Sequence, residues 1–271
     1  IPGEELMDKL LAYESKLLTP RMFQFSLIQK ARKARKKIVL PEGTDPRILE
    51  ASARLMAMDL VDLVLLGDPG VIRQKAAELG LDIPWQHIEV INPTEDPRYE
   101  DYAQTYYGLR KHKNVNLDMA RDAMADVSYF GTMMIYKGDA DGMVSGAMHT
   151  TQHTILPALQ FIKTKPGVSV VSSVFFMCLP DRVSVFGDCA INPNPSAEEL
   201  AEIAISSARS SQAFGIEPRI AMLSYSSGSS GKGVDVDRVR QATELVRQLR
   251  PDLKIEGPIQ YDAAVDPLVG K

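Results

Sequence analysis

Apolar and polar positions follow a repeating order along most of the chain. Short apolar runs, which predict strands buried on both faces, alternate with segments whose apolar residues recur at helical spacing. Strands are expected over residues 37–41, 61–66 and 88–91. Helices are expected over residues 4–18, 20–32, 46–58, 71–79, 98–112 and 117–126, with Thr19 as the N-cap of the second. This order predicts an α/β protein with a mostly parallel sheet covered on both faces.

The second half of the chain has a different pattern. Two β-rich runs, 168–179 and 182–187, flank Pro180–Asp181, which indicates an antiparallel hairpin. A helix over 196–214 follows, with Ser196 and Glu199 spaced as a capping box. Later elements are a strand over 219–224, a Gly/Ser loop over 226–233, a helix over 236–249 and a strand over 254–256. We place the domain change near residues 165–167, which gives a linker helix over 1–18 and domains over 19–166 and 167–271.

Composition excludes some functions. With 45% hydrophobic and 24% charged residues the chain is typical of a globular protein, and a net charge of -4 is unlike the basic surface of a nucleic-acid binder. The basic run 30–37 follows a predicted helix, where cations complement the helix dipole, so we interpret it as a solvated face. No apolar run is long enough to span a membrane, and Cys178 and Cys189 are expected to be buried, reduced thiols. A cytoplasmic location is the simplest expectation.

The segment 141–160 is the most informative for chemistry. A short apolar strand tip over 142–144 turns at Ser145-Gly146 and is followed by His149, Thr150 and Thr151. The end of a strand in an open α/β sheet is the expected place for a ligand. Free backbone N–H groups at the start of the following helix would favour an anion there.

Other segments leave alternatives open. The turn 41–47 either holds a ligand through Glu42 or Arg47, or is simply a well-made strand-to-helix turn. Arg110, at the end of a predicted helix, either caps that helix or grips a phosphate. His149 and His153 lack the Glu of a zinc-binding His-Glu-x-x-His motif, so we expect no metal site. The loop 224–233, with Ser224 and Ser226, does not fit a Walker motif but is placed to form a ligand edge.

Many blocks in order resemble the phosphate acetyltransferase family. They cover residue 19 to the end of the chain and lie at 38–43, 109–113, 141–151, 160–164, 171–177, 187–193, 197–204, 217–226 and 257–264. The resemblance implies two αβα domains of the isocitrate/isopropylmalate dehydrogenase kind, with a cleft between them. It also implies reversible acetyl transfer between coenzyme A and phosphate, by attack of the coenzyme A thiolate on acetyl phosphate, with neither a metal nor a permanently bound cofactor.

The resemblance extends to single residues. Arg110 matches a cleft arginine of the family, which favours the phosphate-gripping role. Ser145, His149, Thr150 and Thr151 match the cleft-lining turn, and we add Ser224 and Ser226 as substrate-binding candidates. The expected partners are acetyl phosphate, phosphate, coenzyme A and a second copy in a homodimer or larger homo-oligomer.

Two departures from the family pattern bear on activity. Leu156 stands where members normally carry an arginine, and the loss of one charged hydrogen bond weakens binding by roughly 1.5–3 kcal/mol. The sequence also ends at Lys271, before the family region that supplies a serine, an arginine and the candidate aspartate base, so we expect impaired activity at this length and assign no catalytic base within it. Two alternatives therefore stay open: a non-catalytic module that senses acetyl-CoA in a larger enzyme, and a phosphate butyryltransferase.

Overall fold

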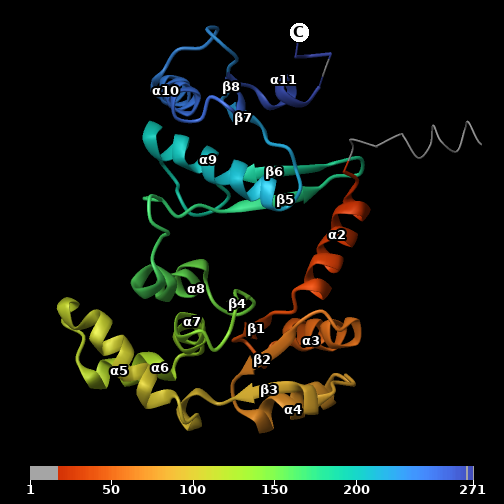
Figure 1. The fold of residues 1–271 in the computed structure, drawn as a ribbon, viewed down its shortest axis with the longest axis vertical. Coiled ribbons are helices and arrows are strands. Elements are labelled where there is room, and N and C mark those ends of the chain that lie inside the picture. The colour runs from red at the N-terminus through yellow and green to blue at the C-terminus, as the bar shows by residue number, and fades with distance from the viewer. Residues whose placement is uncertain (1–17, 267, 271) are drawn as a thin grey trace, which may run out of the picture. The chain divides into compact units, whose positions relative to one another are not determined.

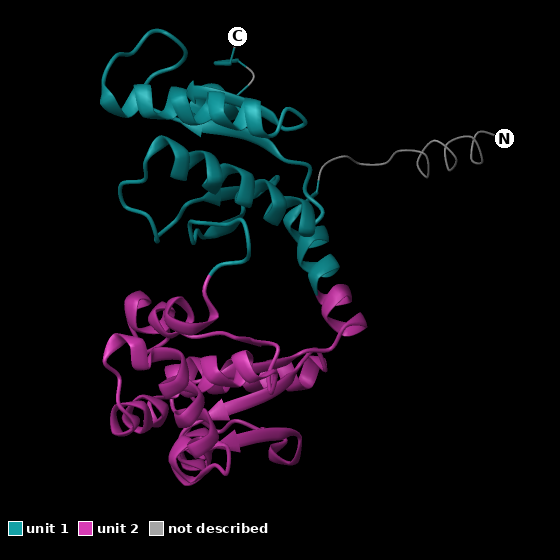
Figure 2. Cartoon of the chain, turned by 60° about the vertical axis from the view of Figure 1, so that its left-hand side comes forward, with its two compact units in different colours: residues 1–27, 164–271 teal, residues 28–163 magenta. Residues whose placement is uncertain are grey.

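The computed structural model describes residues 18–266 and 268–270. The chain divides into two compact units, one made of residues 28–163 and the other of residues 1–27 and 164–271 (Figure 2). The division at 163/164 lies three residues before the predicted domain change, whereas the division at 27/28 cuts through a helix that we had placed whole in the first domain. The predicted domains stay a prediction, and the predicted helix 4–18 lies almost wholly outside the described residues.

The unit of residues 28–163 is built on a parallel sheet with the strand order β3-β2-β1-β4 (Figure 1). Its strands are β1 (Lys37–Leu40), β2 (Asp62–Leu66), β3 (Ile88–Ile91) and β4 (Gly142–Met143). Successive residues of β2 face opposite sides: Val64 and Leu66 belong to one buried cluster, Leu63 and Leu65 to another. The prediction of a parallel sheet covered on both faces is confirmed here.

Helices supply the two covering layers of this sheet. One buried cluster includes residues of α3 (Pro46–Met58) and α4 (Pro69–Glu78), and the other includes residues of α5 (Tyr99–Arg110), α6 (Leu117–Ala125) and α7 (Val127–Lys137). After β4 come α8 (Thr151–Pro157) and the π-helix η4 (Ala158–Ile162). Short 3₁₀ helices lie at η1 (Trp85–His87), η2 (Pro93–Glu95) and η3 (Lys111–Lys113).

The other unit contains two separate strand pairs. The predicted hairpin is confirmed as β5 (Val174–Cys178) antiparallel to β6 (Val183–Gly187), although residues 168–173 form no strand. A parallel pair, β7 (Arg219–Leu223) and β8 (Lys254–Ile259), packs with α9 (Ala197–Ala213) and α10 (Val234–Leu249) around a core that contains Met222 and Val246. The short helix α11 (Tyr261–Val265) follows β8. The predicted capping box at Ser196 and Glu199 is present at the start of α9.

The helix α2 (Pro20–Lys33) begins at the predicted N-cap, where the Thr19 hydroxyl accepts from the Met22 N–H at 3.3 Å. Its buried Phe23 contacts the rings of Phe176 and Phe214, with centroid distances of 5.4 and 6.2 Å. All three of these aromatic residues belong to the same unit.

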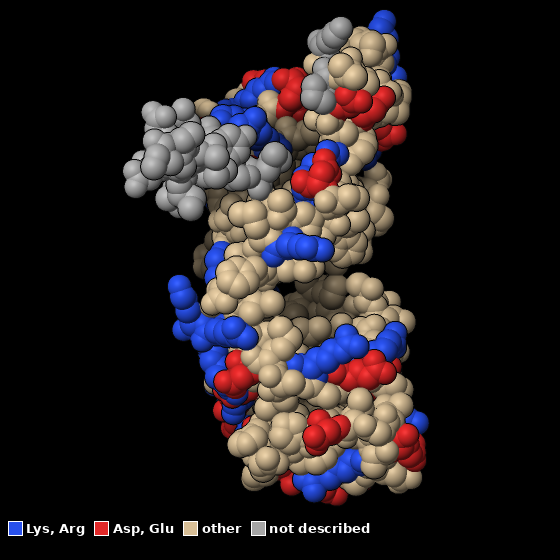
Figure 3. All heavy atoms as spheres, turned by 90° about the vertical axis from the view of Figure 1, so that its right-hand side faces the viewer, with Lys and Arg blue, Asp and Glu red and all other residues tan. Residues whose placement is uncertain are grey.

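The part of the basic run 30–37 that follows α2 is paired with acidic side chains. Arg35 forms ion pairs with Asp59 and Asp62, and Lys36 with Asp141. These residues belong to the unit of residues 28–163. On the face of that unit drawn in Figure 3, basic and acidic side chains are interspersed. This pairing agrees with our interpretation of the run as a solvated face.

One expectation about the cysteines is wrong. Cys178 is exposed and Cys189 is only half-buried, and both are free thiols. Cys178 ends β5, a strand with one exposed face, and Cys189 lies in the loop that follows β6. The apolar runs that suggested burial belong to a hairpin covered on one side only.

Candidate active site

The candidate turn at Ser145–Thr151 lies beside a second turn from the start of the unit. Strands β1 and β4 are parallel neighbours, with Ile38 opposite Gly142. The carboxyl ends of parallel strands meet at one edge of a sheet. The residues that follow β1, above all Glu42, therefore lie against the residues that follow β4.

Glu42 accepts hydrogen bonds from four consecutive main-chain N–H groups of this turn. Its Oε2 accepts from Gly146 at 3.0 Å and Ala147 at 2.7 Å, and its Oε1 accepts from Met148 at 2.7 Å and His149 at 2.9 Å. The Glu42 side chain is completely buried. Burial alone would raise the pKa of this carboxyl, but the hydrogen bonds from Met148, Ala147 and His149 outweigh it and lower the pKa below its usual value.

This arrangement was not foreseen from the sequence, which placed anion-binding N–H groups at the start of the following helix. The backbone donors of residues 146–149 do attract an anion, but that anion is the protein's own Glu42 carboxylate. The helix that follows, α8, has only seven residues, and the Thr150 hydroxyl caps it by accepting from the His153 N–H at 3.3 Å. The N–H groups of residues 146–149 are therefore occupied by Glu42.

The turn after β1 is itself a well-made strand-to-helix turn, as one of the two sequence interpretations had it. Asp45 is the N-cap of α3 and accepts from the Arg47 N–H at 2.8 Å. The Arg47 guanidinium bonds the Asp45 carboxylate and also the main-chain oxygen of Ala147. Glu42 and Arg47 therefore both bind the main chain of the turn after β4 and help to hold its shape.

His149 is held by the same carboxylate. Its Nδ1 lies 2.9 Å from Glu42 Oε1, and because an ionised carboxylate only accepts, Nδ1 carries the proton. The His149 ring stacks on that of His153, with centroids 4.7 Å apart and planes 15° apart. Asp126 Oδ2 accepts from His153 Nε2 at 3.0 Å. The His149 side chain is 28% exposed, so its ring remains accessible from solvent.

The hydroxyls of the turn have different surroundings. Ser145 is half-buried, with its Oγ 3.5 Å from Thr154 Oγ1, whereas Thr151 is exposed at the first position of α8. Leu156, on the same helix, is 37% exposed. The structure thus brings Ser145, His149, Thr150 and Thr151 together in one continuous turn.

Arg110 is the last residue of α5, in the same unit as the turn. Its Nε is buried and has no hydrogen-bond partner among the described residues. One helical turn earlier, Tyr106 donates to Gln160 Oε1 of η4 at 2.7 Å. Burial raises the pKa of Tyr106, and the nearby Arg110 charge opposes that rise. A buried guanidinium N–H without a partner is a donor available to a ligand oxygen.

Ser224 and Ser226 lie in the other unit, at the end of β7. The Ser224 N–H donates to the Ile259 main-chain oxygen at 2.9 Å, and Ser224 Oγ accepts from the Ser226 N–H at 3.4 Å. The Ser226 hydroxyl is buried and has no partner among the described residues. A Cβ added at Gly231 would lie 2.0 Å from Ser226 Oγ, so the loop closes tightly over this serine.

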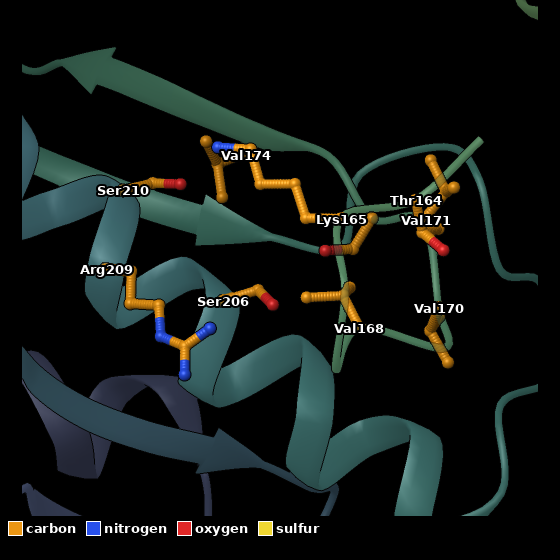
Figure 4. A pocket seen from close by; sticks show the side chains of 10 residues that line it. Thr164, Lys165, Val168, Val170, Val171, Val174, Ser206, Arg209 and Ser210 are labelled. Atoms are coloured by element: carbon orange, nitrogen blue, oxygen red, sulfur yellow. The ribbon is translucent and has the colours of Figure 1, made fainter. Parts of the chain in front are cut away.

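The same unit contains a pocket of about 340 Å³ that holds none of the predicted site residues. Figure 4 shows Ser206, Arg209 and Ser210 on α9 at one side of it. Valines of the loop before β5 and the Lys165 side chain line the rest.

Sequence reasoning missed two structural carboxylates. The role of Glu42 as the support of the turn was not foreseen. Asp188 likewise accepts from Ser173 Oγ and from the main-chain and side-chain N–H groups of Asn192. Although burial opposes it, these bonds hold the pKa of Asp188 far below its usual value. In the sequence, the only indication of either role was a single acidic residue close to a Gly or Asn in a predicted turn.

Within residues 18–266 and 268–270, no helix combines the length and hydropathy of a membrane-spanning segment. The same residues contain no cluster of three or more His, Cys, Asp or Glu side chains placed to hold a metal ion.

Comparison with known proteins decides the family. The sequence pattern described as phosphate acetyl/butaryl transferase matches residues 22–271. The chain belongs to this family. It is 57% identical to the phosphate acetyltransferase of Synechocystis sp. over 99% of the chain, and 52% identical to that of Corynebacterium glutamicum over 94%. These matches cover 39% and 77% of the two relatives, so the chain spans about two-fifths of the Synechocystis protein.

Two solved structures agree with the fold. A phosphotransacetylase from Streptococcus pyogenes superposes with a TM-score of 0.85 at 43% identity, over 93% of this chain and 77% of that one. A branched-chain phosphotransacylase from Enterococcus faecalis matches with a TM-score of 0.59 at 15% identity, over 85% of this chain and 71% of that one, which shows the fold alone.

Proposed function

We propose that this chain is the acetyl-transferring part of a phosphate acetyltransferase, which interconverts acetyl-CoA plus phosphate with coenzyme A plus acetyl phosphate. The observation that carries the proposal is the 57% identity to a phosphate acetyltransferase over 99% of the chain. The turn at Ser145–Thr151 supports it, because a rigid turn with four polar side chains is suited to hold a small polar substrate.

In the proposed reaction the coenzyme A thiolate attacks the carbonyl carbon of acetyl phosphate, and phosphate leaves. Arg110 offers a buried, unpartnered N–H to the phosphate oxygens. The hydroxyls of Ser145, Thr150 and Thr151 donate to the same substrate, and fixed donors of this kind stabilise the charge that develops on the leaving group. Ser224 and Ser226 stay proposed substrate-binding residues. No resident cofactor is needed, since coenzyme A is itself a substrate.

The two alternatives are weighed by separate observations. A phosphate butyryltransferase is disfavoured because the relatives at 52–57% identity are named phosphate acetyltransferase, while the branched-chain enzyme is only 15% identical. A non-catalytic module that senses acetyl-CoA is favoured only by Leu156, in place of the family arginine. The retained Arg110 and the intact turn favour an enzyme.

The decisive experiment follows thioester absorbance from coenzyme A and acetyl phosphate. It compares the 271-residue chain with a version extended by the C-terminal region of the Corynebacterium glutamicum relative. Turnover with acetyl phosphate, and much slower turnover with butyryl phosphate, is expected of the extended version. If both versions are silent while a Leu156→Arg form turns over, the natural sequence is not a catalyst and the sensing module becomes the better account.

Arg110→Ala tests the phosphate assignment in the form that turns over. Losing a charged hydrogen bond of roughly 1.5–3 kcal/mol should raise the KM for acetyl phosphate or lower kcat by about 10- to 100-fold. Lys111→Ala, an exposed neighbour, is the matched control. Unchanged kinetics in Arg110→Ala would remove Arg110 from the site.

Several finer expectations stay predictions. They are the dehydrogenase-like arrangement of the domains, the catalytic base in the family's C-terminal region, the cytoplasmic location and the homodimer.

A further inference from the structure

The pocket beside α9 contains none of the residues assigned to acetyl transfer, and all of its lining belongs to the unit of residues 1–27 and 164–271. Its volume is about 340 Å³, and it lies between the loop that precedes β5 and one face of α9 (Figure 4). Since a water takes about 30 Å³ in the liquid, this space holds roughly eleven waters. It is therefore large enough for a small organic molecule and too small for the whole of coenzyme A.

Apolar side chains form one part of the wall. Four half-buried valines line the pocket: Val168, Val170, Val171 and Val174. Their branched methyl groups favour an aliphatic ligand body, because binding removes apolar surface of both partners from water. Hydroxyl groups form another part, from Thr164, Ser172, Ser206 and Ser210.

The loop that carries these valines is held in place by side chains from outside it. Glu202 of α9 accepts from the N–H groups of Ser169 and Val170. The Asn192 side-chain amide donates to the Val171 main-chain oxygen at 2.8 Å. The wall is thus formed in the absence of a ligand, which lowers the entropy cost of binding.

Two cations face the apolar wall. Arg209 of α9 and Lys165, at the start of the loop, both line the pocket, and neither has an ion-pair partner within the described part of the chain. In Figure 4 the Lys165 side chain extends from its loop toward Val174 and Ser210. No acidic side chain belongs to the lining. The pocket therefore carries two positive charges beside a patch of methyl groups.

One acidic group acts on Arg209 from outside the lining. The bond from the Ser169 hydroxyl is the main cause that lowers the pKa of Glu202, and the Arg209 charge acts in the same direction. Glu202 is thus ionised, but its carboxylate accepts three hydrogen bonds from Ser169 and Val170. Because these donors share its negative charge, Arg209 remains available to a second anion.

We propose that this pocket binds a short aliphatic carboxylate, a branched acid of about four to six carbons. Its carboxylate lies between Arg209 and Lys165, and its alkyl part packs on the valines. A guanidinium matches a planar carboxylate with two parallel N–H donors. A bare phosphate ion would pair with the same cations but would leave the valine methyl groups without a partner. The inference goes beyond the proposed function and does not depend on it.

Valine methyl NMR spectra of the 271-residue chain, titrated with isovalerate, test the site. The signals of the four lining valines, each assigned by its own valine-to-isoleucine substitution, should shift saturably. Isovaleramide has the same shape without the charge, and inorganic phosphate has charge without the alkyl part. Each should bind at least about 10-fold more weakly, because each lacks one of the two kinds of contact. Absence of a saturable shift, or equal binding of either control, overturns the inference.

Variants of α9 test the assignment of the residues. Arg209→Ala should weaken isovalerate binding by about 10-fold, and Arg209→Lys by less, since lysine keeps the charge but not the paired donors. Ser206→Leu fills the space and should abolish binding, with an unchanged circular dichroism spectrum as evidence of folding. Arg182→Ala is the matched control, because Arg182 lies in the turn between β5 and β6 and does not line the pocket. Binding by Arg209→Ala as tight as in the wild-type protein contradicts the proposal.

Two further titrations separate this site from acetyl transfer. The version extended by the C-terminal region should bind isovalerate as the 271-residue chain does, and loss of binding would mean that the added region fills the pocket. Saturating coenzyme A or acetyl phosphate should leave isovalerate binding unchanged. Displacement by either would make the pocket part of the substrate site and overturn the inference. A chain that binds isovalerate but transfers no acetyl group overturns the proposed function and leaves this inference standing.

Discussion

Two polar loops follow parallel strands in this chain and are stabilised in opposite ways. After β4, residues 146–149 give four main-chain N–H groups to one buried carboxylate. After β7, residues 224–231 are held by separate contacts, such as the Gly228 N–H to the Pro258 oxygen at 2.8 Å and the Gln260 N–H to Ser227 Oγ at 3.0 Å. One polar atom there, Ser226 Oγ, has no partner in the described chain. The shape of the first loop therefore depends on one residue, whereas the shape of the second depends on several separate contacts.

The largest effect should come from removing the shared carboxylate. Glu42→Ala leaves four N–H donors and His149 Nδ1 without their partner, and we expect a loss of about 3–5 kcal/mol in the free energy of unfolding of residues 28–163. Trp85, the single tryptophan, packs against a core cluster of this unit, so urea unfolding followed by its fluorescence measures the change.

Glu50→Ala is the matched control, since Glu50 is an exposed carboxylate on α3 of the same unit. It should change the free energy of unfolding by no more than about 0.5 kcal/mol. Equal effects of the two substitutions would mean that stability after β4 is not concentrated in Glu42.

Acid should reproduce part of this effect. The pKa of Glu42 is lowered in the folded state from its ordinary 4.5. The ionised carboxylate therefore stabilises the folded state fully above pH 4.5, and this stabilisation is lost as the pH falls through the lowered pKa. The protection of the amides of residues 146–149, measured as the exchange rate relative to the intrinsic rate at each pH, should therefore fall at acid pH in the wild-type protein. In Glu42→Gln the same amides should lose this pH dependence, and an unchanged acid response there would assign it to another group.

A smaller effect is expected in the second loop. In Gly231→Ala the new Cβ would lie 2.0 Å from Ser226 Oγ, so the loop backbone must shift, at a cost of about 1–3 kcal/mol. Amide exchange should accelerate over residues 224–231 and stay unchanged over residues 146–149. Gly228→Ala is not a suitable control because its φ of 59° disfavours any side chain, whereas Ser229→Ala, at an exposed loop position, is suitable.

The smallest effect should come from Ser226→Ala. Its hydroxyl is buried without a partner, so removing it abolishes a desolvation penalty and should leave stability unchanged or raise it by up to about 1 kcal/mol. Urea unfolding or amide exchange of residues 224–231 measures this. A clear loss of stability would show that the hydroxyl has a partner in solution. Weaker substrate binding by Ser226→Ala, without a loss of stability, would instead show that the hydroxyl contacts the substrate.

The sequence predicted most elements because their signals are local. The N-cap at Thr19 and the capping box at Ser196 each involve residues at most three positions apart, and both are present. The helix α7 was not assigned because it is buried around most of its circumference and its residues show no polar face. Residues 168–173 were predicted as strand from their valines, yet the Glu202 carboxylate accepts from the Ser169 and Val170 N–H groups and holds them as a loop.

The site was predictable only in part, for a related reason. Polar side chains clustered within the segment 145–151 could be recognised in the sequence. The carboxylate that holds this cluster in place could not be recognised in the sequence, because Glu42 is separated from its four N–H donors by 104 to 107 positions. Burial of a carboxylate also depends on neighbours that only the folded sheet brings together.

The donors that Glu42 holds belong to the main chain, and every residue type except proline carries such a donor. Ala147 and the exposed Met148 are therefore free to change identity without loss of the turn's shape, whereas Gly146, at a φ of 111°, is not. The backbone shape of this loop thus depends on Glu42, which is distant in the sequence, whereas its surface depends on the side chains of Ala147 and Met148. A library randomised at Ala147 and Met148, with proline left out, should thus change the surface of the loop while its backbone stays as it is.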